Sequence, residues 1–297
     1  MKEESPSVTT TRDSDALLPL LARRTPLYHA NVPFIVCWAQ KSGCTAVLKW
    51  FLYHAGLLEE AATYKSGNMR LGIHSYENKV LKARPGYTQE LLYSLHSGEP
   101  AINFMRCPFE RVFSSYMILN NNMFLTMAKG GTVTPGFRLR QAVLEFTHGQ
   151  SGELNSPLSF RQYLLWLKEQ DVNSLDPHHT PQYSPLYRQV QVTHYRLDDF
   201  DRATAQVEEA FSIASSEGAQ HTFSSGHHRH KQPVPAADAL AFLENGLPLD
   251  RFPLREVPVV DRALLEGSAF EPIIREIFAV DIAAYERIKP LGTGVRA

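Results

Sequence analysis

The sequence predicts an α/β fold in which a parallel sheet is flanked by helices, giving three layers. Residues 33–38 form a continuous apolar run, which is typical of a strand buried on both faces of a parallel sheet. Residues 101–105 form a second such run, and helical spacing of apolar residues follows each run, at 45–55 and at 108–119. Strands that alternate with helices favour parallel pairing.

Further elements follow from the same periodicities. We expect a third strand at 189–195, a short helical turn at 16–24, and helices at 88–95, 138–147, 158–169, 199–215, 235–244 and 271–287. Residues 60–85 carry no regular period and are expected to be irregular. The polar, glycine-bearing stretch 120–136 is predicted to be a long loop, of the kind that often closes over a site.

Composition and net charge limit the classes of function that the protein can have. The 297 residues are 43% hydrophobic and 21% charged, which is enough for a sizeable core. The formal net charge of −1 excludes a whole-protein attraction to nucleic acid or to a membrane surface. An anionic ligand therefore needs a local site. We expect a weakly ordered segment over residues 1–25 and a single domain over 26–297, because no convincing linker divides the rest.

The chain shows no targeting or spanning segment and few cysteines. Its polar first residues lack the basic start and apolar run of a signal peptide, and no run approaches the roughly 18 apolar residues of a membrane span. These features predict a soluble, cytoplasmic protein. Cys37, Cys44 and Cys107 form no Cys-x-x-Cys pair, so we expect free thiols in a reducing compartment.

A candidate phosphate-binding loop joins the first strand to the first helix, at residues 38–45 (WAQKSGCT). Such a junction presents unpaired backbone N–H groups and the positive end of the helix dipole. Lys41 adds a charge, Gly43 allows close approach of the main chain, and Thr45 adds a hydroxyl. An ATP-binding P-loop is disfavoured, because the lysine precedes the glycine and the upstream glycine is missing.

A second anion-binding element follows the second strand, at residues 106–116 (RCPFERVFSSY). Arg106 lies at the carboxyl end of the strand, where ligands of open α/β sheets bind. Ser114 lies two turns into the next helix, so the guanidinium and the hydroxyl are placed to hold one phosphate from two sides. Arg111 and Tyr116 are expected to be structural.

Here the sequence resembles a known family. The pattern Arg-x-Pro-x-x-Arg-x-x-Ser-x-Tyr at 106–116 resembles the 3′-phosphate motif of sulfotransferases that use 3′-phosphoadenosine 5′-phosphosulfate (PAPS). The stretch 40–45 is similar to their 5′-phosphosulfate loop, Pro-Lys-Ser-Gly-Thr-Thr, with Gln40 and Cys44 as departures. Neither departure removes a charge or the glycine, although a thiol is the weaker donor.

A third segment extends the likeness to the Golgi-type carbohydrate branch, sulfotransferase family 2. Residues 176–182 (DPHHTPQ) and 192–200 (VTHYRLDDF) resemble segments of that branch in the same order. The resemblance covers roughly residues 33–200 and fades towards the C-terminus. It implies the sulfotransferase fold, a sheet like that of the P-loop NTPases, with PAPS lying across the strand ends.

The resemblance also implies roles for individual residues. Lys41 would bind the 5′-phosphate and the bridging oxygen as the sulfuryl group leaves, giving PAP (3′-phosphoadenosine 5′-phosphate) as product. The loop and first helical turn would hold the same phosphate, and the 3′-phosphate would be held by the guanidinium and hydroxyl of the second motif. The residues expected at the nucleotide are Lys41, Ser42, Gly43, Cys44, Thr45, Ala46, Arg106 and Ser114. Sulfuryl transfer in this form resembles phosphoryl transfer and requires no metal.

The acceptor hydroxyl needs a general base, for which histidine is suited near neutral pH. The hypothesis is His74, which lies between the two phosphate elements, where related enzymes carry a Gly-Leu-His stretch; Glu77 is the second choice. A solvent-facing or core histidine fits the sequence as well. His178, His179 and Gln182 are expected to line the acceptor cleft, or else to act as caps in a turn.

Two questions stay open in the sequence. The basic stretch at 227–231 (HHRHK) has three histidines but no nearby carboxylate, so a mobile basic loop over the nucleotide is favoured over a metal site. The function expected is sulfation of a hydroxylated acceptor, with a glycan favoured. The alternatives are a P-loop-type kinase, which needs an acid where Arg106 follows the strand, and a non-catalytic nucleotide-binding module on the same fold.

Overall fold

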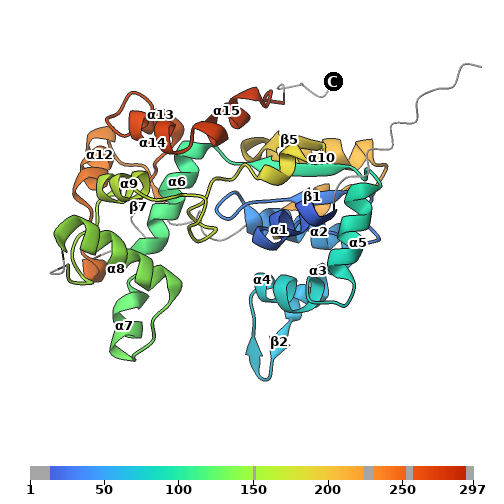
Figure 1. Cartoon of the computed structure of the whole chain (residues 1–297), viewed down its shortest axis with the longest axis horizontal. Coiled ribbons are helices and arrows are strands. Elements are labelled where there is room, and N and C mark those ends of the chain that lie inside the picture. The colour runs from blue at the N-terminus through green and yellow to red at the C-terminus, as the bar shows by residue number, and fades with distance from the viewer. Residues whose placement is uncertain (1–13, 150–151, 224–230, 252–256, 292–297) are drawn as a thin grey trace, which may run out of the picture.

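A small parallel sheet forms the centre of the computed structural model, which describes residues 14–149, 152–223, 231–251 and 257–291. The strands β1 (Ile35–Cys37), β4 (Ala101–Met105) and β5 (Val192–Arg196) pair in the order β1-β4-β5. Both pairings are parallel, with Ile35 opposite Ala101 and Ala101 opposite Val192. The fold is thus mixed α/β, with a three-stranded parallel sheet flanked by helices (Figure 1).

The first hydrophobic core joins the sheet to four helices of ten or more residues. These are α1 (Ser14–Arg23), α2 (Cys44–Ala55), α5 (Tyr87–His96) and α10 (Phe200–Ala210). Helix α2 forms because Val47, Leu48, Phe51 and Leu52 share one face, and all four are buried. The helix is fixed from the side by Glu208 of α10, which accepts a hydrogen bond from Trp50 Nε1 at 2.8 Å.

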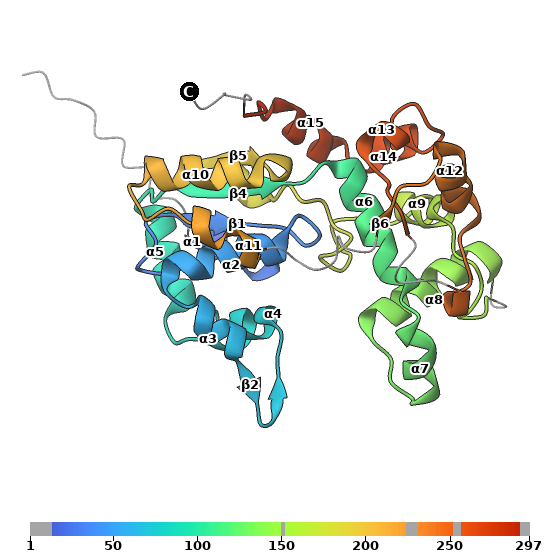
Figure 2. The same ribbon diagram turned by 180° about the vertical axis from the view of Figure 1, so that it is seen from behind.

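The second hydrophobic core surrounds α6 (Pro108–Tyr116). Its other helices are α8 (Pro135–His148), α9 (Phe160–Lys168), α12 (Ala236–Asn245), α13 (Arg262–Leu265), α14 (Glu271–Ile277) and α15 (Ala279–Arg287). Figures 1 and 2 show these helices grouped beside the sheet region. Phe104 belongs to the first core and Met105 to the second. The carboxyl end of β4 is therefore the junction of the two cores.

The irregular region expected at 60–85 contains short ordered elements. They are α3 (Leu58–Thr63), a hairpin of β2 (Lys65–Ser66) and β3 (Met69–Arg70), α4 (Ile73–Tyr76) and a π-helix (Glu77–Leu81). Elements of two to six residues are too short to show a period in the sequence. Burial of Ala61, Tyr76 and Leu81 in the first core holds them in place.

Other stretches also differ from expectation. The predicted loop 120–136 contains α7 (Met123–Lys129), which buries Phe124, and α8 begins at Pro135. Residues 271–287 form two helices, α14 and α15, separated at Phe278. Within the segment 1–25, which was expected to be weakly ordered, the helical turn predicted at 16–24 is present as α1, whose Leu17 and Leu21 pack in the first core.

Short elements complete the described chain. They are the 3₁₀ segments Met117–Asn120, Pro185–Arg188, Leu197–Asp199, Glu217–Ala219 and Leu249–Arg251, the helix α11 (Gln220–Phe223), and the strands β6 (Lys231–Gln232) and β7 (Val257–Pro258). Strands β6 and β7 pair in parallel as a separate two-stranded sheet. Within the described ranges, no helix has both the length and the apolar character that crossing a bilayer demands.

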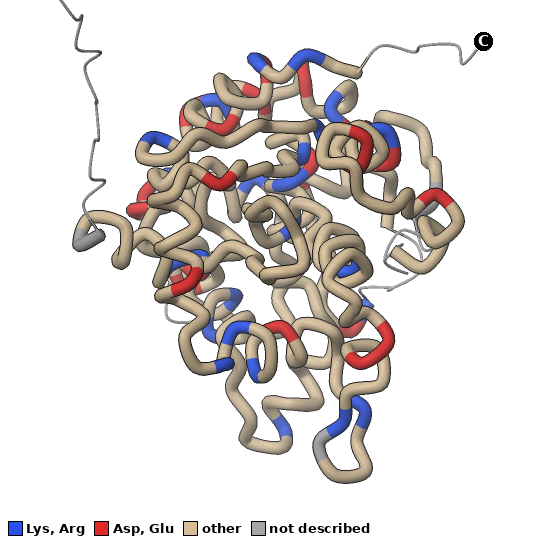
Figure 3. Tube along the Cα trace, turned by 90° about the vertical axis from the view of Figure 1, so that its right-hand side faces the viewer, with Lys and Arg blue, Asp and Glu red and all other residues tan. Residues whose placement is uncertain are grey.

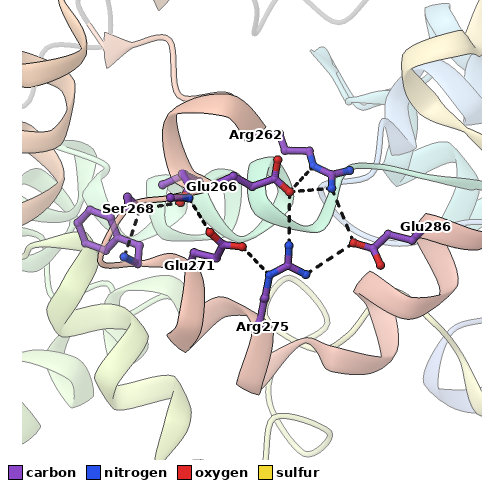
Figure 4. A network of polar contacts seen from close by, with 9 residues as sticks. Arg262, Glu266, Ser268, Glu271, Arg275 and Glu286 are labelled. Carbon is purple, nitrogen blue, oxygen red and sulfur yellow. Dashed lines mark hydrogen bonds and ion pairs between the residues drawn. The ribbon is translucent and has the colours of Figure 1, made fainter.

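Charged residues of both signs are interspersed along the trace (Figure 3), in line with the net charge of −1. One group of them forms a network on the C-terminal helices (Figure 4). Arg275 contacts Glu271 at 2.6 Å, Glu266 at 3.5 Å and Glu286 at 3.6 Å. Its guanidinium also lies 5.5 Å from the ring of Phe109, so the network covers the first turn of α6.

We expect Arg275→Gln to lower Tm by about 1–3 °C, because exposed ion pairs contribute little individually but several converge on this side chain. The decrease should shrink in 1 M NaCl, where the Debye length is about 3 Å. Thermal unfolding at low and high salt measures both effects. A decrease independent of salt would assign the stabilisation to packing on Phe109 instead.

Candidate anion-binding site

The loop between β1 and α2 has a backbone that few sequences permit. Lys41 and Gly43 both have positive φ angles, 66° and 69°. Gly43 is the N-cap of α2 and packs against Leu197, which follows β5. A Cβ atom built on Gly43 would lie 2.5 Å from Leu197 Cδ1, so a larger residue at this left-handed position would be strained and would displace the Leu197 side chain.

The N-terminus of α2 presents its backbone donors at this loop. Gly43 has no side chain that could cap the helix. The first helical hydrogen bond is donated by Val47 N–H to Gly43 O at 3.0 Å. The N–H groups of residues 44–46 precede that bond and lie at the positive end of the dipole. Ser42 differs from the expectation, because its N–H donates to Ala39 O at 3.1 Å.

Arg106 lies beside the loop, at the carboxyl end of β4. Its Nη1 donates to Lys41 O at 3.3 Å, and its Nη2 lies 3.4 Å from Glu110 Oε2 on α6. The side chain is 11% exposed. The two motifs are 65 positions apart along the chain at this contact, yet they form one site at neighbouring strand ends.

The side-chain amide of Gln182 connects the two motifs. Its Oε1 accepts hydrogen bonds from Ser42 Oγ at 2.8 Å and from Arg106 N–H at 3.1 Å. Its Nε2 donates to Arg106 O at 2.7 Å. Because Gln182 is only 1% exposed, it braces the loop against the strand end. This is a different role from the acceptor contact that the sequence led us to expect.

The segment that carries Gln182 is itself anchored from two distant helices. Asp281 of α15 accepts backbone hydrogen bonds from Gln182 and Tyr183, both at 2.8 Å. Arg24, which follows α1, donates to Gln182 O at 3.1 Å and to Thr180 Oγ1 at 3.0 Å. Asp281 is 1% exposed, so this anchor is fully inside the protein.

The two neighbouring histidines have different surroundings. His179 is 2% exposed and contacts Tyr163 OH through Nδ1 at 2.6 Å. Burial lowers the pKa of His179 to about 3, so its ring is neutral. His178 is exposed and lies 2.6 Å from Asp176 Oδ1. Of the expected acceptor residues, the structure therefore leaves only His178 open to solvent.

Most of the remaining residues of the second motif are buried and support the fold, whereas Ser114 is partly exposed. Arg111 is 1% exposed and donates through Nε to Gln40 O at 3.0 Å, and burial lowers its pKa to about 10. Tyr116 OH donates to Leu158 O at 2.6 Å. Both are structural, as expected. Ser114 is half-buried on α6, whereas Ser115 is buried and donates to His178 O.

Buried polar atoms near the loop have no hydrogen-bond partner among the described residues. They are Trp38 Nε1, Gln40 Oε1 and Arg111 Nη2. Unpaired buried polar groups are rare in folded proteins because each costs about 1–3 kcal/mol. A polar ligand at the loop is one way to complete such bonds.

His74 faces the N-terminus of α2, as the sequence hypothesis requires. Its Nε2 lies 3.2 Å from Thr45 Oγ1 and 3.8 Å from Cys44 Sγ. On the other side, its Nδ1 lies 2.9 Å from Glu77 Oε2. The Glu77 carboxylate is buried and also bonded to Lys82 Nζ at 2.5 Å, so it is oriented towards the ring.

These contacts set the charge on His74. Hydrogen bonds to Cys44 and to Glu77 raise the pKa of His74 to about 9, against the opposing effect of burial. Burial alone would raise the pKa of Glu77, but the hydrogen bond to His74 and the charge of Lys82 lower it. His74 is therefore mainly an imidazolium at neutral pH in the unliganded protein.

Sequence reasoning missed three contributors to this site. Asp281, Arg24 and Lys82 carry no recognisable motif. Asp281 and Arg24 contact Gln182, which is 99 and 158 positions away along the chain, whereas Lys82 contacts Glu77, only five positions away. Of the basic stretch expected to close over the nucleotide, His227, His228, Arg229 and His230 lie outside the described residues. The backbone of Lys231 belongs to β6.

In the described part of the chain, no three His, Cys, Asp or Glu side chains gather in a way that could hold a metal ion. Comparison of the chain with protein-family models, with curated proteins and with solved structures found no match. The site is thus defined by its own geometry: a cationic loop, a helix N-terminus and a strand-end arginine in contact.

Proposed function

We propose that this protein is a sulfotransferase that moves a sulfuryl group from PAPS to a hydroxyl of an acceptor, with a glycan as the favoured class. The observation that carries the proposal is the contact between Arg106 and the Lys41 carbonyl. It brings together, at neighbouring strand ends, the two segments that the sequence predicts to bind anions. A ligand with phosphates at both ends of an adenosine ribose fits such a pair of motifs.

In this proposal the two motifs bind different ends of the nucleotide. The N–H groups at the start of α2 and the Lys41 ammonium bind the 5′-phosphosulfate. Arg106, with Ser114 from α6, binds the 3′-phosphate. Glu110 is the present partner of Arg106 at 3.4 Å, and the phosphate would compete with it for the guanidinium.

The chemical step follows from these positions. The acceptor oxygen attacks the sulfur of the phosphosulfate, and the bond from sulfur to the bridging oxygen breaks, leaving PAP. Lys41 stabilises the charge that develops on the bridging oxygen. The proton of the acceptor hydroxyl goes to His74 Nε2, which faces the loop, while Glu77 holds Nδ1.

Sulfate transfer from PAPS labelled with ³⁵S, measured over a panel of hydroxylated glycans, tests the proposal. We expect labelled product with the wild-type chain and a loss of at least about 100-fold with Lys41→Met, the size of losing one charge-stabilising donor. Arg188→Met, which removes an exposed arginine elsewhere, is the matched control and should retain activity.

Other results would assign the rival functions. PAP binding without turnover on any acceptor would indicate a non-catalytic nucleotide-binding module. Transfer of the γ-phosphate of ATP, dependent on Mg²⁺, would indicate a kinase. Absence of both PAP binding and transfer would overturn the assignment altogether.

The raised pKa of His74 predicts an alkaline pH profile. The base must be unprotonated, so kcat/KM should rise about tenfold per pH unit up to about pH 9 and then level off. Glu77→Gln removes the carboxylate on Nδ1 and should move the midpoint down by roughly one unit. NMR titration of the His74 ring measures the same shift without any assay of activity. A flat profile from pH 7 to 9 would exclude His74 as the base.

A further inference from the structure

Cys44 is the first of four residues in a continuous chain of polar contacts. Its Sγ lies 3.8 Å from His74 Nε2, and His74 Nδ1 lies 2.9 Å from Glu77 Oε2. Glu77 in turn is bonded to Lys82 Nζ at 2.5 Å. The thiol, imidazole and carboxylate come from two segments that are 30 positions apart. Helix α2 contributes the thiol, and α4 with the π-helix contributes the rest.

This order of groups is the one that generates a nucleophilic thiolate. An imidazole within reach of the sulfur takes the proton, and a carboxylate behind it stabilises the imidazolium. Cys44 is also the first residue of α2, a helix of 12 residues, where the dipole favours negative charge. The charged groups around the sulfur are His74 and Lys41, with Glu77 and Lys82 behind the imidazole.

The charge balance at the sulfur agrees with this geometry. Burial alone would raise the pKa of the Cys44 thiol, but the hydrogen bond and charge of His74, with the backbone and charge of Lys41, lower it overall. Burial raises the pKa of Cys37 to about 12, and it raises the pKa of Cys107 as well. The side chain of Cys44 is half-buried, whereas the other two are buried.

We propose that Cys44 is a modification site, a nucleophilic thiolate that forms a mixed disulfide with low-molecular-weight disulfides. The thiolate attacks one sulfur of the disulfide, a new S–S bond forms, and the old one breaks. The second half leaves as a thiolate and takes up a proton from His74 or from water. The disulfide is the oxidant and is reduced to one thiol, and an added thiol reverses the reaction.

The adduct would act on the site through its position. Cys44 N–H belongs to the first turn of α2, which the proposed function assigns to the 5′-phosphosulfate. A group attached to Sγ fills that space and removes the thiolate that holds His74 charged. This consequence, the exclusion of the nucleotide, rests on the proposed function. The reactivity of the thiol does not.

The reactivity is tested by alkylation with iodoacetamide over pH 5–10, with peptide mapping of all three cysteines. We expect Cys44 to react first, with a half-maximal rate below the ordinary thiol value of about pH 8.5. His74→Gln should lower its rate at pH 7 about tenfold or more, since one pKa unit changes the thiolate fraction tenfold. Two results in the wild-type chain would each overturn the proposal. One is a half-maximal rate of Cys44 labelling at or above about pH 8.5, and the other is labelling of Cys44 no faster than that of Cys37 and Cys107.

Incubation with oxidised glutathione is the second arm. Intact mass should show one adduct at Cys44, absent in Cys44→Thr and reversed by dithiothreitol. If PAP slows the modification, the adduct and the nucleotide share the loop. If the adduct forms at the same rate with saturating PAP, the modification site stands and the nucleotide assignment fails. If no adduct forms at Cys44, the modification site fails, whatever PAP does.

Discussion

Replacing Arg106 by methionine should weaken PAP binding about 30- to 1000-fold while changing the affinity for adenosine 5′-phosphosulfate by less than about threefold. The guanidinium is 11% exposed, and loss of one member of such a charge pair costs about 2–4 kcal/mol. Adenosine 5′-phosphosulfate lacks the 3′-phosphate, so its binding does not depend on a contact between that group and Arg106. Calorimetric titration with both ligands measures the ratio of the two affinities.

The ratio matters because Arg106 also supports the loop through Lys41 O at 3.3 Å. A general disturbance of the loop would weaken both ligands equally, and equal losses would contradict the assignment of the 3′-phosphate to Arg106. Arg106→Lys keeps the charge but not the planar pair of donors, so it should fall between the wild type and the methionine variant. Arg188→Met should change neither affinity, because that side chain is exposed elsewhere.

Replacing Asp281 by alanine should lower the free energy of unfolding by about 3 kcal/mol or more, the size seen when one partner of a buried charged group is removed. The change leaves the Gln182 and Tyr183 N–H groups, both 2.8 Å from the carboxylate, without their acceptor. It also removes the carboxylate that interacts electrostatically with the buried Arg111. Urea denaturation measures the loss.

Asp238→Ala is the matched control, because Asp238 is an exposed aspartate in the first turn of α12. It should stay within about 0.5 kcal/mol of the wild type, as surface substitutions do. Asp281→Asn retains one acceptor and should be intermediate. A loss of less than about 1 kcal/mol in Asp281→Ala would show that water replaces the carboxylate, and that the anchor of Gln182 is not fixed by it.

The sequence alone determined the elements that positioned the first two motifs. The strand expected at 101–105 is β4 with the same bounds, and the helix expected at 45–55 is α2 with one further residue. Apolar runs and helical spacing are local properties of the chain, so they can be recognised without a fold. The placement of Arg106 at a strand end follows from the same local pattern.

The tertiary structure decided which groups meet. Ser42 and Gln182 are 140 positions apart, and Gln182 and Asp281 are 99 apart, so no periodicity links them. From the resemblance of residues 176–182, Gln182 and His179 were expected at an acceptor cleft or else as caps in a turn, but both are buried and support the site from inside. Likewise, the contacts of His74 with Cys44 and Thr45 depend on how α4 packs against α2, and the contact with Cys44 contributes to the charge of the ring. Local pattern specifies elements, whereas long-range packing specifies burial and therefore the chemistry of each side chain.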